Sequence, residues 1–142
     1  MSLMKVFDVS GSAVSAQSQR LNVVASNLAN ADTVAGPDGS AYKARQVVFQ
    51  TVLMGQGLSG ASADTSTGVR VSTVTESDAP GRRVHDPKHP SADAEGYVTY
   101  SNVSAVEEMV NMISASRSYQ NNVDVMNTAR SLLLKTLQIG QG

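Results

Sequence analysis

Glycine and proline are distributed very unevenly along this chain of 142 residues. Neither residue occurs from Ser12 to Ala35, and neither occurs from Tyr97 to Ile139. All four prolines and most of the eleven glycines lie between these segments, among Ser, Thr and Asp. Because glycine and proline interrupt regular helices, the pattern predicts a helix towards each end of the chain and an irregular, β-rich middle.

Apolar residues recur every seven positions in both terminal segments. In the first segment they are Phe7, Val14, Leu21 and Leu28; in the second they are Met112, Tyr119, Met126 and Leu133, preceded by Ala105. A second line in the second segment lies four residues further on and includes Met109, Val123 and Leu137. A strict seven-residue repeat predicts helices that wind around each other. We therefore predict an α+β fold, in which long N- and C-terminal helices form a coiled-coil pair, with a small irregular β-rich middle region.

Local signals indicate where these segments begin and end. Ser104 and Glu107 form an S-x-x-E capping box, which predicts the start of the second helix near Val103. Gly140 follows the last apolar residues and is suited to end this helix. The expected segments are residues 1–35 for the N-terminal helix, 36–102 for the middle region and 103–142 for the C-terminal helix.

The middle region contains short strand and turn signals. Alternating or continuous apolar residues predict strands at 47–53 and 69–73. Gly36-Pro37-Asp38-Gly39 predicts a turn, because proline presets one backbone angle and glycine accepts a left-handed one. Residues 54–68 are rich in Gly, Ser, Thr and Ala, which predicts a flexible loop.

The terminal helices carry unusually few charges. Arg20 is the only charged residue between Val9 and Ala31, and Arg117 and Asp124 are the only ones between Met109 and Ala129. Asn, Gln and Ser stand where Glu and Lys are usual in a solvent-facing helix, although charged residues make up roughly a quarter of a typical chain. Uncharged polar faces suit contacts with other protein surfaces. We expect these helices to pack laterally among copies of the chain; a poorly optimised surface helix is the alternative.

The composition excludes several classes of function. Eleven basic and twelve acidic residues give a net charge of −1, which offers no electrostatic reason for a nucleic-acid partner. The absence of cysteine excludes disulfides, thiolate metal sites and cysteine nucleophiles. No apolar run approaches the roughly 18 residues of a membrane span, and the first residues lack the pattern of a cleaved signal peptide. We expect no nucleic-acid partner and no direct membrane insertion.

Two patterns could indicate chemistry, and both have simpler explanations. Gly55 to Gly60 spells G-x-G-x-x-G, so a small cofactor-binding enzyme is an alternative function, but no helical pattern follows to receive a pyrophosphate. His85 and His89, with Asp86 and Asp93, could be drawn as a metal site. Prolines between them exclude a regular helix that would place both rings on one face, so incidental loop histidines are the preferred interpretation.

Two longer motifs resemble a known family. Residues 18–33 are similar to the N-terminal signature of bacterial flagellar rod and hook proteins, whose core reads R-L-N-x-x-A-x-N-L-A-N and begins here at Arg20. Residues 108–123, from Glu108 to Val123, resemble the matching C-terminal signature. The short chain and the stretches at 42–49 and 86–98 are similar to the proximal rod members of this family, although another short rod protein is an alternative.

The resemblance implies a structural subunit of the flagellar basal body, without catalysis or cofactors. It implies export through the flagellar type III apparatus without a cleaved signal peptide, and assembly in the periplasm as part of the rod. The implied partners are copies of the chain and other rod proteins, which meet through terminal helices in a helical tube.

An assembly interface on the terminal helices follows from the repeat and the resemblance together. Its predicted residues are Phe7, Val14, Arg20, Leu21, Asn22, Asn27, Leu28, Asn30, Met109, Met112, Arg117, Tyr119, Val123, Met126, Leu133 and Leu137. Arg20, Asn22, Asn27 and Arg117 lie off the seven-residue lines, so we expect them to contact neighbouring subunits rather than to support the fold. Ser101 stands where the family resemblance implies proline, which is expected to loosen the start of the second helix.

Overall fold

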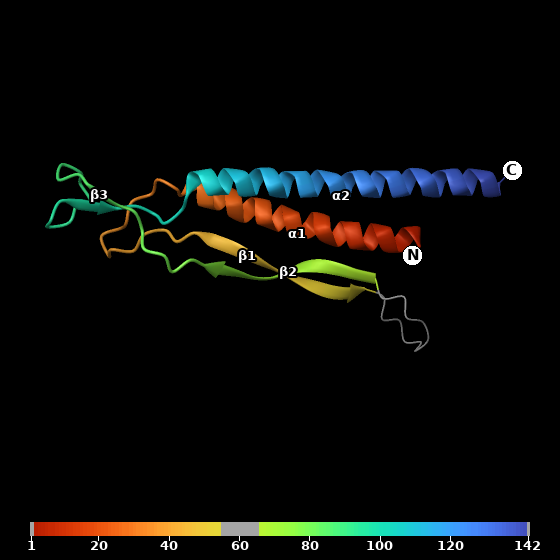
Figure 1. Ribbon diagram of the computed structural model, residues 1–142, viewed down its shortest axis with the longest axis horizontal. Helices are drawn as coiled ribbons and strands as arrows, with labels where there is room; N and C mark the ends of the chain where they lie inside the picture. Colours follow the sequence, from red (N-terminus) through yellow and green to blue (C-terminus); the bar gives the residue numbers. More distant parts are fainter. Residues whose placement is uncertain (1, 55–65, 142) are drawn as a thin grey trace. The chain divides into compact units, whose positions relative to one another are not determined.

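The computed structural model describes residues 2–54 and 66–141 (Figure 1). Its elements are α1 (Leu3–Ala29), β1 (Arg45–Met54), β2 (Ser66–Glu76), β3 (Arg83–His85), β4 (Tyr97–Thr99) and α2 (Ala105–Gly140). The strands form two two-stranded sheets, β1 with β2 and β3 with β4. The predicted α+β fold with long terminal helices and a small β-rich middle is confirmed. The Gly55–Gly60 motif and most of the expected loop at 54–68 lie outside the described residues.

The chain divides into two compact units by its contacts. One unit combines Met1–Gln19, Val48–Thr73 and Ala115–Gly142; the other combines Arg20–Val47 and Val74–Ser114. Both helices and both long strands contribute a portion to each unit. Neither unit is therefore a continuous stretch of sequence, and each contains part of the helix pair.

In the first unit, the beginning of α1 lies beside the later part of α2. Leu3 and Val6 line an apolar groove of about 350 Å³ together with Val125 and Leu132. The fully packed apolar positions in this unit are alanines: Ala16, Ala115 and Ala129. Small side chains at such positions let two helix backbones approach closely.

The start of β2 is also held against α1 in this unit. The Val69 backbone N–H donates to the Ser12 hydroxyl at 3.1 Å, and that hydroxyl donates to the Val9 carbonyl at 2.7 Å. A Cβ atom on Gly68 would lie only 2.8 Å from the Ser12 hydroxyl oxygen and 2.5 Å from the Met54 methyl carbon. A larger residue at position 68 would therefore require the side chains of Met54 and Ser12 to move.

In the second unit, the end of α1 lies beside the beginning of α2, and the two run in opposite directions. The Arg20 guanidinium donates to the Asn111 side-chain carbonyl at 3.3 Å. Further along, the Ser101 hydroxyl donates to the Ala31 carbonyl at 2.7 Å. Later residues of the α1 segment thus meet earlier residues of the α2 segment, which is the antiparallel arrangement of a helical hairpin.

The remaining strands form a small antiparallel hairpin in this unit. β3 and β4 pair in the register Arg83 to Thr99, Val84 to Val98 and His85 to Tyr97. Val98 is completely buried and is among the largest fully buried side chains of the described residues. Gly96, directly before β4, has a φ of 83°, a conformation that favours glycine.

The predicted turn before β1 is present. Gly39 has a φ of 79°, and its N–H donates to the Gly36 carbonyl at 2.9 Å. The Asp38 carboxylate accepts hydrogen bonds from the Ser40 hydroxyl and backbone N–H, at 2.8 and 3.1 Å. Both bonds lower the pKa of Asp38, and the bond from the Ser40 hydroxyl has the larger effect.

The helix limits differ by a few residues from those in the sequence prediction. α1 stops at Ala29, because the Asn30 carbonyl accepts from both the N–H and the hydroxyl of Thr33, and this turn redirects the chain. α2 begins at Ala105, and Ser104 accepts from the Glu107 N–H at a long 3.5 Å. Neither helix, within the described residues, has the length and hydropathy needed to cross a membrane.

Candidate assembly interface

The predicted interface residues lie at three levels of burial within the single chain. Half-buried are Phe7, Val14, Arg20, Leu21, Leu28, Asn30, Met112, Tyr119, Val123, Met126 and Leu133. Exposed are Asn22, Met109, Arg117 and Leu137. Asn27 alone among them is buried. Apart from Asn30, which directly follows α1, the first group lies on helices that pack against each other within the chain, and the second is available to another molecule.

The packed line of α2 differs in one respect from the sequence prediction. The residues at every seventh position from Ala105 to Leu133 are half-buried, as a coiled-coil seam requires. The deeper positions lie three residues after them and include Ala115 and Ala129. Met109 and Leu137, which lie four residues after the seam positions, are both 55% exposed. Those two side chains therefore lie at the margin of the intrachain contact.

Large apolar side chains are exposed along α2. Near its beginning they are Val106, Met109, Val110 and Ile113; further along they include Val125, Leu132, Leu134, Leu137 and Ile139. Exposed apolar patches of this kind mark protein–protein contacts. Of these residues, the interface predicted from the sequence contains only Met109 and Leu137. The spacing of the first group by three and four residues is nevertheless visible in the sequence.

Arg20 links the two helices in the second unit. It is half-buried, and its guanidinium donates to Asn111 within the same chain. Asn22, two residues further on, is exposed, and so is Arg117. Asn22 and Arg117 thus keep the exposure that a contact with a neighbouring subunit requires.

Asn27 has a place within the chain's own fold. Its side-chain carbonyl accepts from the Arg45 N–H and the Tyr42 hydroxyl, each at 3.0 Å, and its amide group donates to the Arg45 carbonyl at 2.8 Å. The side-chain amide thus pairs with both backbone groups of Arg45, as a neighbouring strand would, and ties α1 to the start of β1. We expected an assembly contact for Asn27, but both ends of its amide are used inside a fully buried site.

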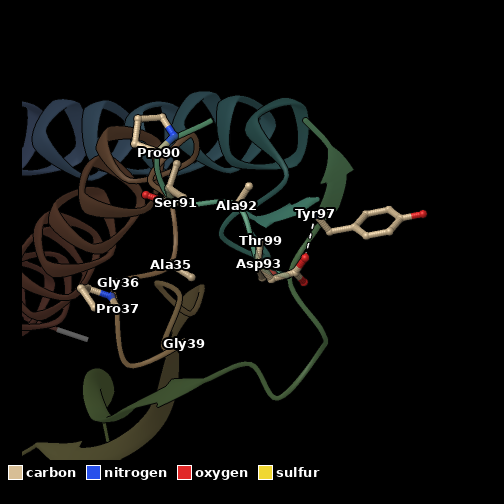
Figure 2. Close-up of a pocket in the computed structure, with 11 residues that line it drawn as sticks. Ala35, Gly36, Pro37, Gly39, Pro90, Ser91, Ala92, Asp93, Tyr97 and Thr99 are labelled. Atoms are coloured by element: carbon tan, nitrogen blue, oxygen red, sulfur yellow. Dashed lines mark hydrogen bonds between the residues drawn. The ribbon is translucent and has the colours of Figure 1, made fainter. Parts of the chain in front are cut away.

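A pocket of about 700 Å³ lies in the second unit, lined by residues 34–37, Gly39 and residues 90–93 together with Tyr97 and Thr99 (Figure 2). The only acidic side chain in its lining is Asp93, which accepts from the Tyr97 N–H at 2.8 Å, the Glu95 N–H at 2.9 Å and the Arg83 guanidinium at 3.0 Å. These bonds lower the pKa of Asp93, and the bond from the Tyr97 N–H has the largest effect. The carboxylate therefore organises the loop before β4.

The two histidines considered as metal ligands have structural contacts. His85 packs edge-on against the Tyr97 ring, with 5.0 Å between ring centroids. His89 accepts the Ser91 N–H on Nδ1 at 3.1 Å. No group of three or more His, Cys, Asp or Glu residues that could hold a metal occurs within residues 2–54 and 66–141.

Comparisons with known proteins assign both terminal helices to the same kind of protein. The family described as Flagella basal body rod protein matches residues 7–37, and the family described as Flagellar basal body rod FlgEFG protein C-terminal matches residues 94–139. The flagellar basal-body rod protein FlgC of Escherichia coli is 56% identical over 141 residues, which are 99% of this chain and 100% of that protein. The chain belongs to the FlgC family of flagellar basal-body rod proteins.

The similarity extends to more distant members of the FlgC family. FlgC of Salmonella typhimurium is 55% identical over 141 residues, and FlgC of Bacillus subtilis is 38% identical over 151 residues. Each similarity covers 99% of this chain and 100% of the relative. The match therefore includes the middle region as well as the helices.

In this FlgC family member, Ser101 and Asn102 hold the segment that leads into α2. Ser101 is buried, and besides its hydroxyl bond to Ala31 its N–H donates to the Thr33 carbonyl at 3.1 Å. Asn102 accepts from the Ala44 N–H at 2.6 Å and donates to the carbonyls of residues 77 and 79 at 3.1 and 2.9 Å. Serine thus makes two hydrogen bonds that proline cannot make. These bonds oppose the loosening of this segment that we expected from Ser101.

Ser101→Pro is expected to lower the free energy of unfolding by about 2–3 kcal/mol, since it removes both bonds and leaves the carbonyls of the half-buried Ala31 and Thr33 without these donors. Ser101→Ala keeps the backbone bond and is expected to lower it by about 1 kcal/mol. Urea unfolding followed by tyrosine fluorescence measures both values, because the chain has no tryptophan and three of its four tyrosines lie in the second unit. Ser91→Ala, at an exposed position, is the control. A Ser101→Pro chain as stable as the original would contradict this role.

Proposed function

We propose that the chain is a structural subunit of the proximal rod of the bacterial flagellar basal body, without enzymatic activity. It assembles through α1 and α2 with copies of itself and with other rod proteins into a helical tube. Full-length similarity to FlgC rod proteins of several bacteria supports this proposal.

The exposed apolar side chains of α2 carry the proposal. They include Val106, Val110, Leu134 and Ile139, which are 72, 61, 50 and 80% exposed. Within residues 2–54 and 66–141, the buried apolar side chains are alanines and valines, while many larger ones are exposed. Burial of these side chains between subunits would add the apolar stabilisation that the single chain lacks.

The route to this location follows from the same proposal. The chain reaches the periplasm through the flagellar type III export apparatus, without a cleaved signal peptide, and joins the rod there. The low charge on the outer faces of the helices supports a place inside the rod, because these faces can be desolvated between subunits at low electrostatic cost.

Deletion of the gene for this chain tests the proposal. We expect cells that lack it to form basal bodies without a rod and to be non-motile, and the reintroduced full-length chain to restore both. In the complemented cells the chain should copurify with isolated basal bodies. Complete rods in the deletion strain, or a complementing chain that never enters basal bodies, would contradict the proposed function.

A further inference from the structure

Two faces of the helix pair in the second unit have no partner within the described chain. One is the α2 stripe, formed by Val106, Met109, Val110 and Ile113, whose side chains are 72, 55, 61 and 56% exposed. The other is the α1 face, formed by Asn22, Ala25 and Ala29, all exposed. Each set is spaced by three or four residues and therefore lies on one side of its helix.

The α2 stripe has the pattern of a helix that docks through its apolar side. Anchors at positions i, i+3, i+4 and i+7 are the usual contacts when a helix lies against another surface. Exposure of four large aliphatic or thioether side chains to water is unfavourable, and their burial against another surface stabilises the contact. The stripe therefore requires a counter-surface that is free of charge and sterically open.

The α1 face has both properties. Its side chains are small and uncharged, so the backbone of a neighbouring helix can come close and large side chains can fill the space between. Arg20 is the only charge between Val9 and Ala31, and its guanidinium is directed to Asn111 of the same chain. No ionised group of this stretch would have to be desolvated without a partner.

We propose that the α2 stripe of one copy packs against the α1 face of a second copy. This inference rests on the proposed function and names the surfaces through which identical subunits meet. Because the two surfaces differ, the contact is heterologous and leaves each copy with one unused surface of each kind. Such a contact repeats from copy to copy into a ring or an open helical array, whereas a contact of the stripe with itself would close as a dimer.

Disulfide trapping tests this pairing cleanly, because the chain has no cysteine. The full-length variants are Val110→Cys, Ala25→Cys and the double variant, each assembled into basal bodies and oxidised. We expect the double variant to give a ladder of disulfide-linked species on non-reducing gels. Co-expression of the two single variants should give linked dimers that contain one copy of each. Neither single variant alone should cross-link.

Further outcomes separate the inference from the proposed function. Val110→Cys paired with Ser91→Cys, an exposed position of the middle region, is the matched control and should give no ladder. Linked dimers of Val110→Cys alone would overturn the pairing in favour of a stripe-to-stripe contact. Linkage to a different rod protein, or normal rods in which the double variant stays unlinked, would overturn it while the proposed function stands. Absence of the original chain from basal bodies would instead overturn the proposed function.

Discussion

Replacing Leu21 or Met126 with aspartate is expected to reduce incorporation of the chain into the rod more than tenfold and to abolish swimming. Both side chains are half-buried members of the seven-residue lines along α1 and α2. An unpaired carboxylate in a packed interface costs about 3–5 kcal/mol, which the small intrachain core cannot offset. The measurements are the amount of chain in purified basal bodies and the diameter of swimming haloes in soft agar.

A control variant makes this result specific. Ser91→Asp introduces the same charge at an exposed position of the middle region and is expected to leave incorporation and swimming within about twofold of the original chain. Equal defects in all three variants would mean that the helices are not the element that assembles.

Replacing Asn27 with alanine is expected to lower the free energy of unfolding by about 3 kcal/mol. The change leaves the N–H and carbonyl of Arg45 without the fully buried side chain that pairs with both, and each such unpaired group costs about 1–3 kcal/mol. Urea unfolding followed by tyrosine fluorescence reports this directly, because Tyr42 itself donates to Asn27. The amount of intact Asn27→Ala chain in cells should therefore be lower than that of the original chain.

Asn22→Ala is the matched control on the same helix. Asn22 is exposed, so its removal is expected to change the free energy of unfolding by less than about 0.5 kcal/mol. Its proposed contact is with a neighbouring subunit, so it should reduce incorporation into rods without reducing the amount of intact chain. If Asn27→Ala unfolded at the urea concentration of the original chain, the intrachain role of this amide would be wrong.

Features that depend on local repetition could be predicted from the sequence. Helices tolerate neither glycine nor proline well, and most of each segment without them lies in α1 or α2. The seven-residue lines identified residues such as Leu21 and Met126 on the half-buried sides of these helices. The depth within the seam was less predictable. On a helix, the positions three and four residues after a seam residue both lie on the same side as that residue, so the repeat does not show which of them is buried. The burial of Ala115 and Ala129 shows that it is the position three residues after.

Features that depend on partners distant in sequence could not be predicted. Nothing beside Asn27 indicates that its amide pairs with Arg45, eighteen positions away, and nothing beside Ser101 indicates donors aimed at residues 31 and 33. An asparagine on a helix has the same local pattern whether it faces another subunit or a strand of its own chain. The contrast between Asn22 and Asn27 shows that burial, which sequence periodicity resolves only coarsely, separates the two roles.

Cryo-electron microscopy of basal bodies purified from cells that produce this chain tests the assembly of the rod through α1 and α2 most directly. We expect antiparallel α1–α2 pairs side by side in the rod wall, with the exposed apolar side chains of α2 covered by neighbouring subunits. A chain that is absent from the rod, or held in it by the middle region alone with both helices uncovered, would show that α1 and α2 do not build the rod.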